Sequence, residues 1–153
     1  MARDDYVLKK LRPSAAAFQL LKDESRLEGY WMLVTLAEGW ASGSNRFLKR
    51  GEILYGAWQG RELVGVCGLN IDPYLDDRNQ GRVRHLFVSA AHRRDGLGRM
   101  LIETVIDRAR QHFAVLNTRA PREAFPFYER LGFELVKEQE FVTHRMKLRH
   151  KGE

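Results

Sequence analysis

Two glycines and three arginines lie close together in the stretch HRRDGLGRML. Its last residues are largely apolar, which is typical of the start of an amphipathic helix. The first amide groups of a helix have no partner within it, and the helix dipole gives that end a partial positive charge. Glycine at positions 96 and 98 leaves room for an anion to approach these amides. Arg93, Arg94 and Arg99 add mobile positive charge around them. The stretch therefore predicts a diphosphate site, although a simple capped turn before a helix has the same composition.

The spacing of the glycines excludes two common phosphate-binding motifs. A dinucleotide fingerprint, G-x-G-x-x-G, needs a third glycine where this chain has Leu101. A P-loop needs Lys and then Ser or Thr after its last glycine, where this chain has Arg99 and Met100. The pattern that does fit is R-x-x-G-x-G, from Arg93 to Gly98.

A second motif follows downstream, AFPFYERLGF, with the pattern A-x-x-x-Y-x-x-x-G-F from Ala124 to Phe133. Together with the strand RHLFV, the glycine turn, the long helix and the strand AVLNTR, it resembles the GNAT superfamily of acetyl-CoA-dependent N-acetyltransferases in order and spacing. The resemblance is strong over about the last seventy residues, and the order of elements upstream agrees with it. It implies an enzyme that transfers the acetyl group of acetyl-CoA to a primary amine, on a small molecule or a protein. No metal is implied.

The resemblance also implies which residues hold the acetyl-CoA. Backbone groups of Leu86, Phe87 and Val88 would pair with the pantetheine arm as one extra strand, and the Phe87 amide would polarise the thioester carbonyl. The turn would hold the pyrophosphate through the amides of Arg93, Arg94, Asp95, Gly96, Leu97, Gly98 and Arg99. Pro121 stands where the family often has an Asn, and proline offers neither an amide side chain nor a backbone N–H.

Tyr128, in the box FYERLGF, would lie near the thioester sulfur. A proton donor eases the departure of a thiolate, and a phenol with a pKa of about 10 is protonated at neutral pH. Phe127 and Phe133 lie close by in sequence, so a packing role for Tyr128 stays open. Cys67, the only cysteine, lies in the apolar run LVGVCGL. This context predicts a small buried side chain rather than a nucleophile, so direct attack in a ternary complex is expected, without an acyl-enzyme.

The motifs do not identify the base that deprotonates the amine. Many members of the superfamily have a Glu where this chain has Arg82, and arginine stays protonated. His85 and His144 titrate near neutral pH and are the candidates. Strand alternation predicts that His85 shares a face with Val83 and Phe87. Each histidine fits a hydrogen-bonded core or pocket-wall position better than the role of a base, and a chain of waters or an already neutral amine would serve as well. We therefore expect neither histidine alone to be indispensable.

Two stretches bear on the acceptor. NIDPYLDD contains Asp72, Asp76 and Asp77, which could attract a cationic amine or could form a solvated loop. GWASGSNRF contains Arg46, which could bind an acceptor carboxylate, beside Phe47, which could belong to the core. Neither stretch identifies the acceptor.

Hydrophobic periodicity predicts the elements that must position these residues. Strands are expected at residues 6–11, 52–60, 62–71, 82–88, 114–119, 133–136 and 141–148. Helices are expected at residues 14–26, 27–40 and 97–112, and a short one ends at Gly132. Ser14 is a plausible N-cap for the first helix. The order predicts an α/β fold in one domain spanning residues 1–153. Its mixed sheet has about seven mostly antiparallel strands around a parallel crossover, flanked by about four helices.

The composition is that of a globular protein with a basic balance. The 153 residues include 26 Lys and Arg against 20 Asp and Glu, a net charge of +6, spread along the chain. This balance suits phosphate-bearing ligands, and no interleaving of aromatic and basic residues favours a nucleic acid partner. No signal peptide or apolar run of about 18 residues is present, so we expect a cytoplasmic protein without a membrane partner. The resemblance leaves a homodimer open.

A second function class also fits the sequence, a non-catalytic module that binds acyl-CoA or nucleic acid. The arginine at the position of the usual Glu and the basic charge favour it. Tyr128 at its family position favours the enzyme.

Overall fold

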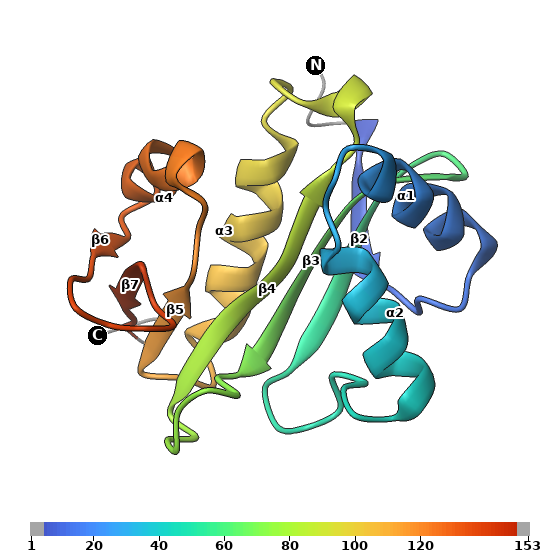
Figure 1. The fold of residues 1–153 in the computed structure, drawn as a ribbon. Helices are drawn as coiled ribbons and strands as arrows, with labels where there is room; N and C mark the ends of the chain where they lie inside the picture. Colours follow the sequence, from blue (N-terminus) through green and yellow to red (C-terminus); the bar gives the residue numbers. More distant parts are fainter. Residues whose placement is uncertain (1–4, 150–153) are drawn as a thin grey trace.

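Seven strands form one mixed sheet in the order β1-β2-β3-β4-β5-β7-β6, in a computed structural model that describes residues 5–149 (Figure 1). The strands are β1 Val7–Lys10, β2 Ile53–Gln59, β3 Glu62–Ile71, β4 Gln80–Val88, β5 Val115–Thr118, β6 Glu134–Leu135 and β7 His144–Lys147. The helices are α1 Ala16–Leu27, α2 Met32–Ser42, α3 Leu97–Ala109 and α4 Phe125–Arg130. Among the described strands, only β4 and β5 pair in parallel, across α3, so the predicted mixed sheet with a parallel crossover is confirmed.

The helices bury the two faces of the sheet in two separate hydrophobic cores. Alternate residues of β3 enter opposite cores, as the period of a strand requires: Val64 packs with α3, whereas Leu63 packs with α1 and α2. Cys67 is fully buried in the core with α3, so its prediction as a small buried side chain is confirmed.

Two predicted helix starts are wrong. The second helix begins at Met32 rather than at residue 27, because Gly29 takes a left-handed conformation (φ 91°) and ends α1. Ser14 is not the N-cap of α1, since the cap position is Ala15 and no side chain bonds the free amides there.

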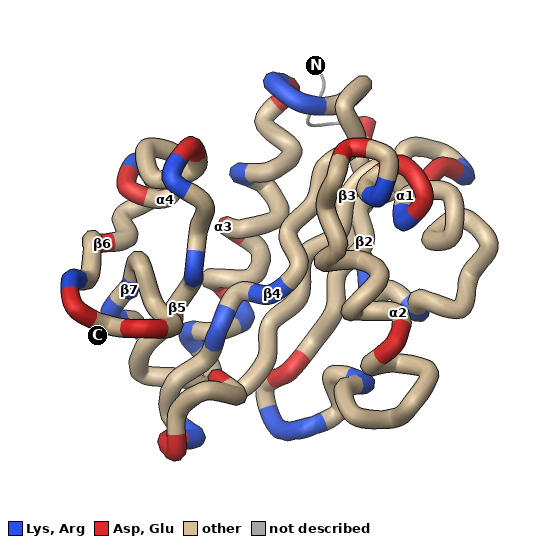
Figure 2. Tube along the Cα trace, in the orientation of Figure 1, with Lys and Arg blue, Asp and Glu red and all other residues tan. Residues whose placement is uncertain are grey.

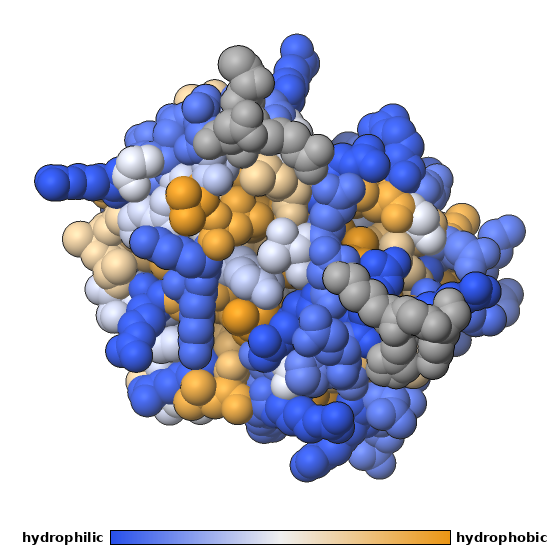
Figure 3. Space-filling model, turned by 180° about the vertical axis from the view of Figure 1, so that it is seen from behind, coloured by the Kyte–Doolittle hydropathy of each residue, from blue (hydrophilic) through white to orange (hydrophobic). Residues whose placement is uncertain are grey.

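The face seen in Figure 3 is largely hydrophilic, with apolar residues in small groups. Within residues 5–149, no helix combines the length and the apolar character that crossing a bilayer requires.

The strands β4 and β5 separate after a short paired segment, and this separation creates the site. Their parallel pairing ends at Arg82 and Asn117, while β4 continues to Val88 beside β3 (Figure 1). A bulge in β4 increases the divergence: two residues, His85 and Leu86, lie opposite the single residue Cys67, and His85 has φ 61°. Among the described strands, none pairs with the edge of β4 beyond Arg82 that faces away from β3, and this edge faces a cleft.

Candidate active site

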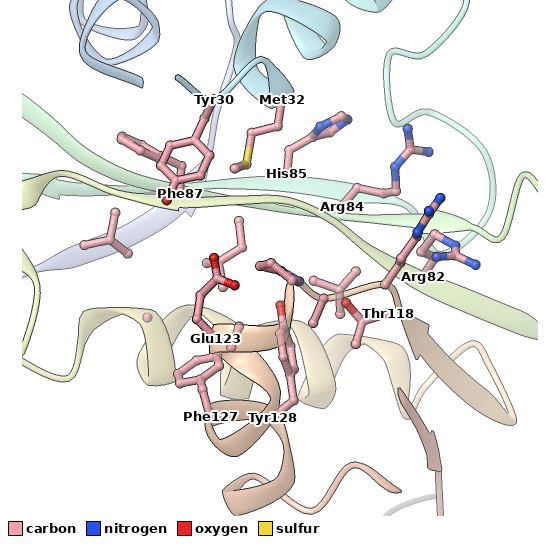
Figure 4. A pocket seen from close by; sticks show the side chains of 18 of the residues that line it. Tyr30, Met32, Arg82, Arg84, His85, Phe87, Thr118, Glu123, Phe127 and Tyr128 are labelled. Carbon is pink, nitrogen blue, oxygen red and sulfur yellow. The ribbon is translucent and has the colours of Figure 1, made fainter. Parts of the chain in front are cut away.

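A cleft of 620 Å³ lies between the separated strands (Figure 4). Its walls come from β4, from the start of α2, from the segment that follows β5 and from α4. Among the predicted site residues, those that line it are His85, Leu86, Phe87, Val88, Arg93, Gly98 and Tyr128. Residues distant in sequence are thus brought together along one channel.

A second hollow of 340 Å³ adjoins the cleft at the start of α3, and the two share lining residues such as Val88, Gly98 and Phe127. It is strongly basic, because four arginines line it: Arg93, Arg94, Arg99 and Arg130. Figure 2 shows basic residues gathered at the turn before α3. The predicted glycine turn thus forms the positively charged end of the channel.

The two glycines of this turn have different roles. Gly96 is the N-cap of α3 with φ 81°, a left-handed conformation that side chains disfavour. Gly98 has an ordinary helical conformation, and a Cβ there would lie 3.6 Å from the Phe127 ring at the junction of the two hollows. No side chain of residues 5–149 caps the helix, so in this part of the chain the first amides of α3 are open to a ligand. The turn therefore fits a diphosphate.

The β4–α3 connection is held from two sides. On one side, the buried Tyr6 hydroxyl donates to Asp95 Oδ2 at 3.1 Å and lies 2.8 Å from His92 Nδ1. On the other side, Glu24 of α1 accepts hydrogen bonds from Ser89 Oγ (2.9 Å) and Ala90 N (2.8 Å). The Asp95 side chain therefore orients the turn, and only its backbone is left for the predicted phosphate role.

Arg93 is also held in place. Its Nε donates to the Val88 carbonyl at 3.0 Å, its terminal nitrogen pairs with Glu28, and its guanidinium lies over the Phe87 ring. Arg94 is exposed beside the basic hollow, and Arg99 pairs with Glu103 one turn along α3. The mobile charge predicted at the turn thus rests mainly on Arg94 and Arg99.

The position of Tyr128 is compatible with both roles that the sequence leaves open. It is 5% exposed and packs edge-on against Phe127 and Phe133, at centroid distances of 5.1 and 5.3 Å. Its phenol also lines the cleft and interacts by a hydrogen bond with Thr118. Burial raises the pKa of this phenol above its ordinary value of 10. Tyr128 is therefore protonated at neutral pH and can donate its proton within the cleft.

His85 does not share a face with both Val83 and Phe87, so this prediction is wrong. The bulge shifts the alternation, which puts Val83 in the core with α3 and Phe87 in the core with α1 and α2. His85 lies on the α2 side, edge-on to Phe47 and hydrogen-bonded to the Met32 backbone. Burial, and then the charge of Arg84, lower its pKa to about 3, so it is neutral and weakly basic at pH 7.

We expect the substitution His85→Gln to change kcat less than about tenfold, since a group with so low a pKa is a poor general base. The measurement is the steady-state rate of CoA release, with far-ultraviolet circular dichroism to check the fold. A loss of about a thousandfold with the fold intact would contradict this expectation.

His144 is completely buried, so its prediction as a hydrogen-bonded core or wall residue is confirmed. Its Nε2 lies 2.7 Å from Glu129 Oε2 and its Nδ1 lies 2.9 Å from Thr143 Oγ1. The ring stacks on Tyr128 at 28°. His144 therefore supports Tyr128 from outside the cleft.

Arg82, at the position where the family often has a Glu, belongs to a buried ion pair. Its Nε lies 3.0 Å from Asp72 Oδ1, and the two side chains are 3% and 0% exposed. Asp72 also accepts hydrogen bonds from Asn117 Nδ2 and from the Tyr74 amide. Asp72 is therefore neither a solvated loop residue nor free to attract an amine, in contrast to the exposed Asp76 and Asp77.

We expect Arg82→Ala to lower the free energy of unfolding by about 3–5 kcal/mol, because it leaves the Asp72 carboxylate buried without its counter-ion. Urea denaturation measures this change. Arg12→Ala, at an exposed arginine outside the cleft, is the matched control and should change stability by less than about 0.5 kcal/mol. Equal effects of the two substitutions would contradict the structural role of Arg82.

Arg46 does not lie in the cleft. Its Nε donates to the Trp40 carbonyl at 2.8 Å, at the end of α2, and it lines a separate hollow. Phe47 is buried in the core. Neither residue therefore faces the channel that contains Tyr128.

Several residues of the cleft have no signal in the sequence. They are Tyr30, Met32, Tyr74, Arg84, Thr118, Arg119 and Glu123. Most of them lie in connections or at the ends of elements, where the tertiary fold decides what they face.

Comparison with known proteins agrees with this geometry. A family profile described as "Acetyltransferase (GNAT) domain" matches residues 35–149. A candidate acetyltransferase from Exiguobacterium sp. 255-15 has 25% identity, a TM-score of 0.83 and coverage of 94% of this chain and 93% of that one. An acetyltransferase from Streptococcus agalactiae 2603 has 18% identity and a TM-score of 0.72, with coverage of 94% of this chain and 99% of that one. The ribosomal-protein-S18-alanine N-acetyltransferase from Escherichia coli has 16% identity and a TM-score of 0.67, with coverage of 97% of each chain. The cleft between separated strands, the glycine turn and the matched profile together show that the chain belongs to the GNAT acetyltransferase family.

Proposed function

We propose that this protein, with residues 1–153 acting as one domain, is an acetyl-CoA-dependent N-acetyltransferase that acts on a primary amine. Acetyl-CoA or another acyl-CoA is the cosubstrate in this family. The observation that carries the proposal is the continuous channel from the basic glycine turn, along the free edge of β4, to the Tyr128 phenol.

The channel offers a suitable group for each part of the donor. The open amides at the start of α3, with Arg94 and Arg99, would hold the pyrophosphate. Backbone groups of Leu86, Phe87 and Val88, beyond the last β4–β5 pair, would bind the amides of the pantetheine arm as an added strand does. Acetyl-CoA supplies an activated acetyl group as a thioester. An amide on the edge of β4 that faces the cleft would stabilise the negative charge that develops on the thioester carbonyl oxygen. The Phe87 amide, predicted for this role, instead points toward Val66 of β3, because the ladder that the Ser89 N to Val64 O bond continues makes Phe87 and Val66 a hydrogen-bonded pair.

Tyr128 acts as the general acid toward the departing CoA thiolate. Its raised pKa keeps the proton on the phenol, and Thr118 and the surrounding rings fix its orientation. Transfer is direct, because Cys67 is fully buried, is not among the residues that line the cleft and has its pKa raised by burial. The amine attacks in a ternary complex. Arg82 cannot accept its proton and neutral His85 is a weak base, so the amine either binds already neutral or loses its proton to water.

The test is CoA release, read with a thiol reagent, across a panel of primary amines with acetyl-CoA as donor. The proposal expects amine-dependent release that follows saturation kinetics in both substrates. If acetyl-CoA raised the melting temperature but no amine, including peptide N-termini and lysine side chains, promoted release, a non-catalytic acyl-CoA-binding module would be the better description.

A further inference from the structure

The end of the cleft opposite to the glycine turn is lined by arginine. Arg82 and Arg84 project from β4 at this end (Figure 4), and Arg119, the residue that follows β5, also lines the cleft. The one acidic side chain among the described residues of the cleft, Glu123, lies toward Phe87 in Figure 4, away from these arginines. The acceptor end therefore carries an excess of positive charge.

The nearest acid neutralises only one of the three arginines. Asp72 pairs with Arg82 and accepts two further hydrogen bonds, from Asn117 and from the Tyr74 amide. Even so, the buried Arg82 Nη2 has no hydrogen-bond partner among residues 5–149. The Tyr74 ring lies over the guanidinium, 4.8 Å away, and stacks on Phe141. Arg82 and Tyr74 thus form one wall of the cleft, and Asp72 balances the charge of Arg82.

Arg84 and Arg119 are the cleft arginines without a direct partner, although Arg84 also lines the adjoining hollow that contains Glu52, Asp76 and Asp77. In the described part of the chain, neither side chain makes an ion pair or a hydrogen bond. Glu52, the other carboxylate that acts on Arg84, already accepts hydrogen bonds from Asn70 Nδ2 and the Ile71 amide at 3.0 Å. Arg84 is half-buried, so its charge has lost part of its hydration without gaining a partner.

We propose that the acceptor is a primary amine that also carries an anionic group, a carboxylate or a phosphate, and that Arg84 and Arg119 bind this group. The inference rests on the N-acetyltransferase function proposed above and adds the class of substrate. A guanidinium presents two parallel N–H groups that match two oxygens of either anion. Binding there would give Arg84 the partner that the protein does not supply.

The same charges favour the reactive form of the acceptor. Nearby positive charge disfavours an ammonium group and so promotes the neutral amine that attacks. His85 beside Arg84 shows this effect, since the arginine charge adds to burial in lowering its pKa. The arginines therefore replace part of what a basic Glu at position 82 would do, while the anionic group keeps the substrate bound.

The experiment compares ω-amino acids of increasing chain length with their uncharged amides and with ω-aminoalkyl phosphates. The first readout is the melting temperature in saturating CoA, which needs no turnover. We expect the anionic amines, but not the amides, to stabilise the CoA complex further. The second readout is kcat/KM in CoA release, expected to be about 10- to 100-fold higher for the best anionic amine than for its uncharged counterpart. Whichever series, the amino acids or the aminoalkyl phosphates, gives the higher kcat/KM shows whether the anionic group of the acceptor is a carboxylate or a phosphate.

Arg84→Gln should abolish both differences, mainly through KM of the acceptor, and should leave the shift produced by acetyl-CoA alone unchanged. Arg12→Gln, at an exposed arginine outside the cleft, should retain them. Equal stabilisation by acids and amides, no stabilisation by either, or a preference that survives in Arg84→Gln would overturn the inference. These outcomes leave the proposed function intact, whereas the absence of any shift with acetyl-CoA would remove the proposed function itself.

Discussion

Tyr128→Phe is expected to lower kcat by about 10²- to 10⁴-fold, the range that a lost general acid accounts for. The substitution removes only the hydroxyl, so the edge-on contacts with Phe127 and Phe133 stay in place. KM for acetyl-CoA should change little, because no predicted contact to the pyrophosphate or the pantetheine arm involves this group. The measurement is steady-state CoA release with the best amine of the panel.

Tyr55→Phe is the matched control. Tyr55 is half-buried rather than buried, but burial raises its pKa as it does that of Tyr128, and it does not line the cleft. The substitution should leave kcat nearly unchanged. Comparable rates for wild type and Tyr128→Phe would show that Tyr128 serves only in packing. A loss of the acetyl-CoA melting shift in Tyr128→Phe would instead indicate that the phenol binds the donor.

Gly98→Leu is expected to abolish acetyl-CoA binding. A Cβ added at position 98 would lie 3.6 Å from the Phe127 ring, at the junction of the two hollows. The rest of the Leu side chain would extend into this junction and fill the space proposed for the pyrophosphate. Leucine is also a better helix former than glycine, so the unliganded protein should be no less stable. Ligand-free and ligand-bound melting temperatures separate the two effects.

Gly98→Ala provides a graded comparison, because its single methyl group makes only ordinary van der Waals contacts and should weaken binding less. Gly96 is a poorer position for this test, since its φ of 81° would strain any side chain. An undiminished acetyl-CoA shift in Gly98→Leu would place the pyrophosphate elsewhere.

The sheet and the donor end of the site were predictable because they depend on local pattern. Periodicity in 97–112 and 62–71 indicates a helix and a strand that bury fixed faces, and the glycine turn signals an anion site at the helix start. The start of α2 was missed because Gly29, which ends α1, lies inside a stretch with continuous helical periodicity.

The acceptor end of the cleft could not be predicted from the sequence, because it depends on tertiary contacts that local patterns do not show. The bulge at His85 reverses the alternation of β4, and nothing in the residue types of RHLFV marks it. Asp72 appeared to belong to a polar loop, but its carboxylate is buried because Arg82 lies on the neighbouring strand. Arg119 and Arg84 line the same cleft only because β4 and β5 separate after Arg82.

The central claim is that acetyl-CoA occupies the channel between β4 and β5, and a titration of the melting temperature with acetyl-CoA tests it most directly. When the acetyl-CoA concentration is about one hundred times its dissociation constant, binding that is confined to the folded state should raise the melting temperature by roughly 5–10 °C. The rise should continue with the logarithm of the ligand concentration and should be absent in Gly98→Leu. A melting temperature that stays constant at millimolar acetyl-CoA would contradict the account.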